Sequence, residues 1–287
     1  MKPIKITPKR ILIFVAAIFV IAFFACGVYS PLTVTRYEVA SPDIPPGCGV
    51  RAVLIADLHS YIFGKNQSEL IEKIKNQQPD IIFLAGDIID DKAHRAGALE
   101  FLDGIKNLCP AYYVPGNHEY WSGDIKNIRD IVEAYGIKII SDRYETVQIN
   151  GAMLLIAGSD DPAKMHYEDE SYNNLNALRD AFKSIGDEPG YKILLAHRPE
   201  NIDEYSGLGF DLALTGHAHG GQIRIPFLLP GGLYAPSQGL FPKYTGGLYK
   251  SGGMTQIVSR GLSVELQKPR FFNPPEIVVI DIIPTAR

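Results

Sequence analysis

The chain has 287 residues, of which 46% are hydrophobic and 21% are charged. This balance is typical of a folded protein with one large domain or two small ones, and it excludes a mainly disordered chain. The net charge is -4 and no Lys/Arg-rich run follows the first ten residues, so a basic nucleic-acid-binding surface is not expected. None of the three cysteines lies in a C-x-x-C motif, which argues against a zinc site built from thiolates.

The N-terminal segment predicts a transmembrane helix. Residues 11–29 form a run of 19 residues without a charge, and as a helix they would span roughly 28 Å, close to the hydrocarbon thickness of a bilayer. Basic residues precede this run at Lys2, Lys5, Lys9 and Arg10. By the positive-inside rule, residues 1–10 are then a cytoplasmic segment, residues 11–29 a signal anchor in the cell membrane, and the rest of the chain extracytoplasmic. A cleaved signal peptide is the competing interpretation, although the apolar run is long for one.

Residues 30–49 are rich in Pro and Gly and are interpreted as a linker or a lead-in strand, with the domain proper at 50–287. Beyond residue 50, short apolar runs alternate with segments of helical periodicity, the pattern of an α/β fold. The predicted strands are 50–56, 81–85, 111–114, 137–140, 152–158, 193–196 and 212–215, with closing strands at 256–259 and 276–283. The predicted helices are 68–76, 96–107, 124–134 and 172–185. Residues 220–253 are rich in Gly and Pro and predict irregular loops with short strands.

Five of the seven histidines lie in short polar motifs, and nearly every motif follows an apolar run. The motifs are Asp57-Leu58-His59, Gly86-Asp87, Gly116-Asn117-His118-Glu119, His197 in Ala196-His197-Arg198, and Gly216-His217-Ala218-His219. Chemistry on α/β folds is placed at the carboxyl ends of strands, so these side chains are expected to meet. Asp87 ends a predicted strand, and its two carboxylate oxygens make it the natural bridge between two cations. Mixed imidazole, carboxylate and amide ligands suit Mn, Fe, Zn, Ni or Co better than Ca or Mg.

The order Asp-x-His, Gly-Asp, Gly-Asn-His-Glu, His and Gly-His-x-His resembles the calcineurin-like metallophosphoesterase superfamily. The runs Gly116-Asn117-His118-Glu119-Tyr120-Trp121 and Gly216-His217-Ala218-His219-Gly220-Gly221-Gln222 look like its membrane-anchored bacterial branch. The resemblance covers the chain from about Val50 to the C-terminus. It implies an α/β fold, a four-layer sandwich of two mixed β-sheets flanked by helices, here preceded by one transmembrane helix.

The same resemblance implies a role for each motif residue. The first of two divalent metal ions would be held by Asp57, His59, Asp87 and His219. The second would be held by Asp87, Asn117, His197 and His217. His118 would bind no metal; it would contact the phosphate and help to protonate the leaving group. Two ions about 3.5–4 Å apart can hold a phosphoryl group and activate a water for in-line attack.

The implied function is a membrane-anchored hydrolase of phosphomonoesters or phosphodiesters, with lipid-linked or envelope phosphates as candidate substrates. One alternative is a pyrophosphatase of nucleotide-linked acyl sugars of the UDP-diacylglucosamine type, which conflicts with the predicted orientation because that substrate would lie in the cytoplasm. Another alternative is a non-catalytic metal-binding scaffold, which the intact ligand set and His118 disfavour. The apolar stretch 226–233 could lie against the bilayer or pack as a loop near the site.

Other residues have less specific interpretations. His94 and His166 stand in polar surroundings and are typical of solvated loops. Arg198 and Arg260 could contact a phosphate or form structural ion pairs. Trp121 is more typical of packing than of a substrate platform.

Overall fold

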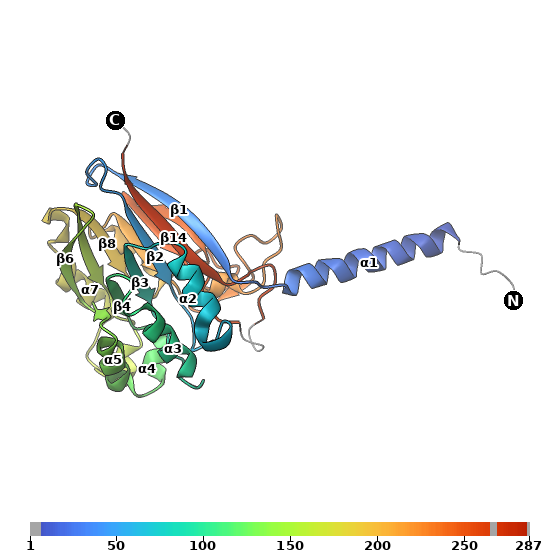
Figure 1. The fold of residues 1–287 in the computed structure, drawn as a ribbon, viewed down its shortest axis with the longest axis horizontal. Helices are drawn as coiled ribbons and strands as arrows, with labels where there is room; N and C mark the ends of the chain where they lie inside the picture. The colour runs from blue at the N-terminus through green and yellow to red at the C-terminus, as the bar shows by residue number, and fades with distance from the viewer. Residues whose placement is uncertain (1–6, 265–268, 286–287) are drawn as a thin grey trace.

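The computed structural model describes residues 7–264 and 269–285 of the chain. Lys2 and Lys5, on which the cytoplasmic interpretation of residues 1–10 partly depends, lie outside the described residues. The described chain consists of one long N-terminal helix and an α/β body (Figure 1). Its helices are α1 (Pro8–Val28), η1 (Lys65–Gln67), α2 (Ser68–Lys75), α3 (Ala96–Ile105), α4 (Asn117–Trp121), α5 (Ile125–Ala134), α6 (Lys164–Tyr167), α7 (Asn174–Phe182), η2 (Ile185–Asp187), η3 (Pro199–Asn201), α8 (Ile202–Ser206) and η4 (His219–Gly221).

The first sheet has six strands in the order β1-β14-β2-β3-β4-β5. Its strands are β1 (Thr33–Ser41), β2 (Val50–Ile55), β3 (Ile81–Ala85), β4 (Ala111–Val114), β5 (Lys138–Ile139) and β14 (Glu276–Pro284). Strands β2 to β5 are parallel, and β14 is antiparallel to β2. Strand β1 pairs in parallel with β14 along its whole length. The stretch between α1 and β2 therefore contributes an edge strand to the sheet.

The second sheet has six strands in the order β12-β13-β9-β8-β7-β6. Its strands are β6 (Arg143–Ile149), β7 (Ala152–Gly158), β8 (Tyr191–Leu195), β9 (Leu212–Thr215), β12 (Gly247–Ser251) and β13 (Met254–Val258). The four central strands are parallel, and β6 and β12 are antiparallel edge strands. A short ladder of β10 (Tyr234–Ala235) and β11 (Gly239–Leu240) stands apart from both sheets.

Three hydrophobic clusters define the layers of the body. Between the sheets, Leu54 and Phe83 of the first sheet belong to the same buried cluster as Ile156, Leu195 and Leu214 of the second. The outer face of the first sheet packs against α2, α3 and α5, and that of the second against α7 and α8. The layers are helix, sheet, sheet and helix, so the predicted four-layer α/β fold is confirmed. Burial on both faces explains why the central strands are continuous apolar runs in the sequence.

Most predicted elements of the body coincide with observed ones. The predicted strands 81–85, 111–114, 152–158 and 212–215 have the observed bounds of β3, β4, β7 and β9. Strands β6 and β12 were not predicted, because their side chains are only half-buried or exposed at the sheet edges and the sequence there is mixed. Helix α7 is shorter than the predicted 172–185, since the Asn173 side chain accepts a hydrogen bond from the Asn176 N–H and caps the helix there.

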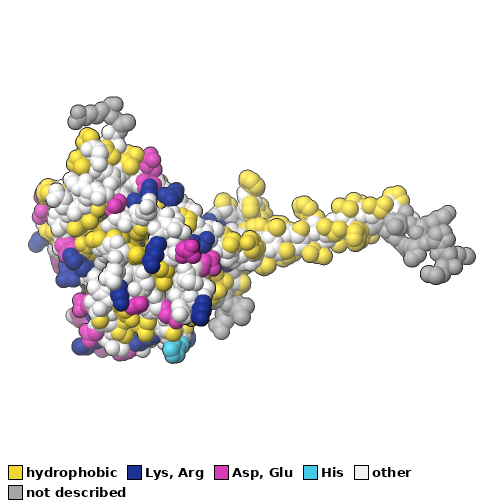
Figure 2. Space-filling view, viewed as in Figure 1, with side chains coloured by type: hydrophobic (Ala, Val, Ile, Leu, Met, Phe, Trp, Pro, Cys, Tyr) yellow, Lys and Arg dark blue, Asp and Glu magenta, His cyan; other side chains and the backbone are white. Residues whose placement is uncertain are grey.

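Helix α1 extends away from the body and is hydrophobic along its length (Figures 1 and 2). Its segment Ile11–Val28 has a mean hydropathy of 3.0 and is long and apolar enough to cross a membrane. The C-terminal end of the helix contacts the body. The Phe23 ring lies 5.7 Å from the ring of Phe271 and 5.1 Å from that of Phe272, and the Phe272 N–H donates a 2.7 Å hydrogen bond to the Gly27 carbonyl.

Candidate metal centre

The seven predicted ligand residues follow five parallel strands. They are Asp57 and His59 after β2, Asp87 after β3, Asn117 after β4, His197 after β8, and His217 and His219 after β9. All seven are buried. Because parallel strands bring their carboxyl ends to one edge, the fold collects these side chains from both sheets at a single place.

The turns that carry these residues have an uncommon backbone conformation. The φ angle is positive, between 46° and 66°, at Asp57, His59, Asp87, His217 and His219. Residues other than glycine rarely adopt this conformation, which costs of order 1–3 kcal/mol at each position. Hydrogen bonds hold the turns: the His59 N–H donates to the Asp87 carbonyl at 2.9 Å, and the His217 N–H donates to the Asp57 carboxylate at 3.0 Å. Strain concentrated in this way is typical of functional sites.

The side chains form two groups that share one carboxylate. The first group, with ligand atoms within 4.8 Å of one another, is Asp57, His59, Asp87 and His219. The second group is Asp87, His197 and His217. Asn117 Oδ1 lies 3.2 Å from His197 Nε2 and so lies beside the second group. Two groups joined through Asp87 have the arrangement of a dinuclear metal site.

The donor atoms also fit divalent cations chemically. Within the described part of the chain, His59 Nε2 and Asp87 Oδ2 are buried atoms without a hydrogen-bond partner, and they lie 3.6 Å apart. A buried polar atom without a partner costs about 1–3 kcal/mol, so a ligand between the two would relieve both. Imidazole, carboxylate and amide donors together suit a transition metal such as Mn, Fe, Zn, Ni or Co.

The electrostatics of the ligand set favour positive charge. Burial raises the pKa of the Asp57 carboxyl, and the neighbouring Asp87 carboxylate raises it further. Burial lowers the pKa of His217 well below its ordinary value, and the Arg198 guanidinium adds to this effect. His217 is therefore neutral, the form in which an imidazole can bind a metal. Two buried carboxylates at one place are costly unless cations compensate them.

Comparison with known proteins covers the part of the chain that carries these residues. The family model for calcineurin-like phosphoesterases matches residues 50–221, which include all seven residues above. The chain belongs to the calcineurin-like phosphoesterase family. With its buried His/Asp site, it is a metal-dependent phosphoric ester hydrolase.

Several curated relatives are similar over most of this phosphoesterase. The metallophosphoesterase YkuE of Bacillus subtilis is 28% identical over 255 residues, covering 86% of this chain and 84% of the relative. A metallophosphoesterase of Helicobacter pylori is 30% identical over 240 residues, covering 82% of this chain and 60% of the relative. A bovine transmembrane protein with a metallophosphoesterase domain is 27% identical, covering 67% of this chain and 46% of the relative. The chain thus spans less than two thirds of the length of the last two relatives.

Two solved structures align with the phosphoesterase at low sequence identity. The protein TT1561 of Thermus thermophilus is 13% identical, with a TM-score of 0.46 over 73% of this chain and 88% of that protein. An archaeal phosphodiesterase is 12% identical, with a TM-score of 0.36 over 77% of this chain and 96% of that protein.

His118 lies beside the ligand groups of the phosphoesterase and is surrounded by carboxylates. Its Nδ1 is 2.7 Å from Asp91 Oδ1 and 3.4 Å from Asp90 Oδ2. Burial disfavours the charged ring, but Asp90, Asp87 and Asp91 outweigh burial and raise the pKa of His118 to about 9. The Trp121 ring lies 4.8 Å from the His118 ring and is 46% exposed. Trp121 is therefore a partly exposed aromatic that packs beside His118.

Asp90 also orients a predicted ligand. Its Oδ2 lies 3.0 Å from His59 Nδ1, which leaves His59 Nε2 facing Asp87. Burial disfavours the Asp90 charge, but hydrogen bonds from His118 and His59 outweigh burial and hold the pKa of Asp90 well below its usual range. A carboxylate on the second nitrogen of a metal-binding imidazole fixes the tautomer and the ring orientation. The sequence alone predicts no role for Asp90 or Asp91, although an acidic pair three and four residues after Asp87 is a visible signal.

Glu119 ties the loop after β3 to the loop after β4. Its Oε2 accepts hydrogen bonds from the N–H groups of Asp87 and Gly116 at 2.9 and 2.8 Å. Its Oε1 accepts from Ile88 and Ile89 at 2.7 and 3.0 Å. Glu119 is fully buried, so this side chain supports the loop after β3 from the start of α4. The Glu of the Gly-Asn-His-Glu motif therefore has a structural role, because it accepts these backbone hydrogen bonds.

Arg198 is held by a structural ion pair at the edge of the site. Its guanidinium donates to both oxygens of the buried Asp161, with Nε 2.6 Å from Oδ2 and a terminal nitrogen 3.0 Å from Oδ1. Another guanidinium nitrogen lies 2.7 Å from His217 Nε2 and 2.8 Å from Ser237 Oγ. Arg260 likewise pairs with Glu276 at 2.7 Å. Both arginines therefore form structural pairs, one of the two roles considered for them.

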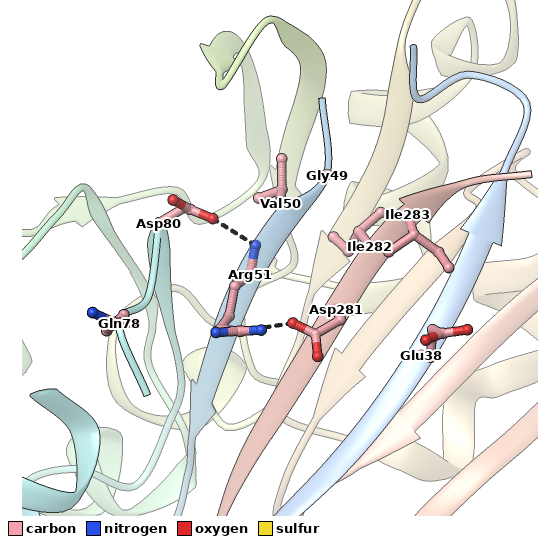
Figure 3. A pocket seen from close by; sticks show the side chains of 9 residues that line it. All are labelled: Glu38, Gly49, Val50, Arg51, Gln78, Asp80, Asp281, Ile282 and Ile283. Carbon is pink, nitrogen blue, oxygen red and sulfur yellow. Dashed lines mark hydrogen bonds and ion pairs between the residues drawn. The ribbon is translucent and has the colours of Figure 1, made fainter. Parts of the chain in front are cut away.

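A cavity of about 500 Å³ lies at the opposite end of the first sheet, beside the amino ends of β2 and β3 (Figure 3). Three of the charged residues that line it are already paired: the Arg51 N–H donates to Asp80 at 2.7 Å, and the Arg51 side chain donates to Asp281 at 2.6 Å. None of the seven predicted metal-ligand residues lines this cavity. His94 and His166 are exposed and also lie outside the ligand groups.

Proposed function

We propose that this phosphoesterase is anchored in a membrane and hydrolyses phosphomonoesters or phosphodiesters, with lipid-linked or envelope phosphates among its substrates. One metal ion is held by Asp57, His59, Asp87 and His219. The other is held by Asp87, Asn117, His197 and His217. The observation that carries the proposal is the pair of buried atoms without a hydrogen-bond partner, His59 Nε2 and Asp87 Oδ2, within a ligand group that shares Asp87 with a second group.

The chain supplies the leaving-group proton from His118. Two bound divalent cations would stabilise the charge on the phosphoryl oxygens and acidify an attacking water. Because Asp91 holds His118 Nδ1 at 2.7 Å, Nε2 is the ring nitrogen that can donate to the leaving oxygen. The raised pKa keeps His118 protonated near neutral pH. Its backbone N–H donates to Asp87 Oδ1 at 2.9 Å, which fixes the acid relative to the shared ligand.

The contact between α1 and the body supports a retained anchor rather than a cleaved signal peptide. Gly27 is buried, and a Cβ at this position would lie 2.1 Å from the Phe271 ring. The helix end is thus fitted to the body, and the Gly27 carbonyl accepts the Phe272 N–H. The basic residues before the helix favour a cytoplasmic N-terminus and an extracytoplasmic catalytic domain. The intact mass of the chain purified from membranes tests the anchor. A mass that lacks residues 1–29 would refute the proposal that the anchor is retained.

The catalytic proposal is tested on the full-length chain in detergent, loaded with Mn²⁺. Aryl phosphomonoesters, aryl phosphodiesters and a panel of envelope lipids are the substrates. The variant His118→Ala should retain both metals but lose about 10²–10⁴-fold in rate, whereas the exposed His166→Ala should keep the rate of the unmodified chain. No turnover of any substrate with metals bound would favour a non-catalytic scaffold, and an unchanged rate in His118→Ala would refute the role of His118.

A further inference from the structure

Two exposed apolar turns project from the segment between η4 and β12. At the first turn, Phe227 is 103% exposed and Leu228 is 77% exposed. At the second turn, Leu240 is 66% exposed and Phe241 is 70% exposed. The Phe241 N–H donates to the Leu233 carbonyl at 2.9 Å, which ties the second turn to the strand-like stretch that leaves the first. Protruding large apolar side chains grouped in this way mark an interaction surface.

A continuous set of contacts joins these turns to the end of α1. Phe271, which touches the Phe23 ring, pairs with Ile223 and accepts a 2.8 Å hydrogen bond from the Arg224 N–H. The first turn comes directly after Arg224 in the chain. It is closed by a hydrogen bond of 2.8 Å from the Leu229 N–H to the Ile225 carbonyl. In Figure 1 the segment between β9 and β12 projects beside the end of α1 that meets the body. Figure 2 shows hydrophobic side chains gathered there and adjoining those of the helix.

The charge of this part of the chain is suited to a lipid surface. The sequence has no Asp or Glu between Asp211 and Glu265, although the whole chain has 32 acidic residues. The segment does contain basic residues, among them Lys243, which is exposed two residues after Phe241. A segment that combines protruding apolar side chains with Lys and has no acidic residue of its own is attracted to a membrane with anionic lipids.

The same segment reaches the metal centre. Ser237, between the two turns, has its Oγ 3.3 Å from His217 Nε2. On the other side, the Asn273 side chain donates to the His219 carbonyl at 2.7 Å, and its neighbour Phe272 donates to Gly27 at the end of α1. The end of the anchor, the apolar turns and the metal ligands are therefore joined over a few residues.

We propose that the two turns, 226–229 and 240–241, insert into the lipid bilayer beside α1 and hold the metal centre at the lipid–water interface. The inference rests on the proposed function, since it takes α1 as a membrane anchor. It assigns the apolar turns to lipid rather than to a protein partner. A phosphate ester whose acyl chains stay in the bilayer would then reach the metals without leaving the membrane.

The test measures the depth of the first turn with a tryptophan. Trp121 is the single tryptophan of the chain. The substitution Trp121→Phe removes its fluorescence, so that the tryptophan of Phe227→Trp is then the only one in the chain. The matched control in the same background is Tyr167→Trp, at an exposed position of α6. Each full-length variant is placed in vesicles of phosphatidylcholine and phosphatidylglycerol whose acyl chains carry bromine. Turnover of a soluble aryl phosphate by each variant, compared with the Trp121→Phe background alone, shows that it is folded.

The expected result is flotation of both variants with the vesicles and quenching of the tryptophan at 227 at least about twofold beyond that at 167, because bromine quenches only at contact depth. Flotation with equal, weak quenching at both positions would overturn the insertion while leaving the anchor in place. A blue-shifted emission at 227 without bromine quenching would assign the turn to a protein contact and overturn the proposal too. Failure to float would overturn the anchor and the insertion together.

Discussion

Replacing Glu119 by Gln should destabilise the protein and weaken metal binding, because each carboxylate oxygen of Glu119 accepts two backbone N–H groups. The substitution turns one of the two acceptors into an N–H₂ donor. If it replaces Oε2, the N–H groups of Asp87 and Gly116, now 2.9 and 2.8 Å away, lose their partner. If the N–H₂ group replaces Oε1, the N–H groups of Ile88 and Ile89 lose their partner. A buried donor without a partner costs about 1–3 kcal/mol, so two such donors lower the free energy of unfolding by roughly 2–6 kcal/mol.

Thermal and denaturant unfolding of the full-length chain in detergent, followed by circular dichroism, measures this loss. For a domain of this size, even 2 kcal/mol corresponds to a fall in Tm of roughly 4–8 °C. Metal content per chain should fall as well, because Glu119 supports the loop that carries Asp87. The control is Glu133→Gln, the same chemical change at an exposed position of α5, which should stay within about 0.5 kcal/mol. A loss below about 1 kcal/mol in Glu119→Gln, with full metal content, would refute the supporting role of this side chain.

Three further outcomes are expected. The variant Asp91→Asn removes a carboxylate that raises the pKa of His118; since the acid form of His118 is needed, the alkaline fall in kcat should move to lower pH, and an unmoved limb would contradict the role of Asp91. Asp161→Asn leaves the largely buried Arg198 guanidinium without its nearest carboxylate and should cost about 3–5 kcal/mol in denaturant unfolding. The exposed Asp130→Asn, which breaks only a surface pair, should cost about 0.5 kcal/mol or less, so equal losses in the two variants would contradict the structural pair. Chelation of the metals should lower Tm, because ligands at a thousandfold above Kd stabilise a fold by about 4 kcal/mol; an unchanged Tm would speak against bound metals.

The central strands and their motifs were predictable because both signals are local. A strand buried on both faces is a continuous apolar run, so 81–85 and 212–215 could be bounded from the sequence. The second residue after each of these runs lies near a carboxyl end, which is why Asp87 and His217 could be expected in one site. The apolar character of α1 was equally visible, because every face of the helix carries apolar side chains.

The supporting contacts could not be predicted, because they join segments far apart in the chain. Whether residues 30–49 formed a linker or a strand stayed open in the sequence, since β1 is stabilised by β14 at the other end of the chain. Edge strands such as β6 are solvated on one side and have no continuous apolar pattern. The roles of Asp90 and Asp91 became clear only when the loops after β2, β3 and β4 met.

The sequence by itself determined which residue types are available for metal ligation and in what order the strands present them, because periodicity and motif spacing are properties of neighbouring residues. Only the tertiary structure decided that Asp90 contacts His59 Nδ1, that Glu119 secures the loop of Asp87, and that the apolar turns of the loop after η4 lie beside α1. These are contacts between distant segments, and packing and hydrogen bonding across the whole fold decide them.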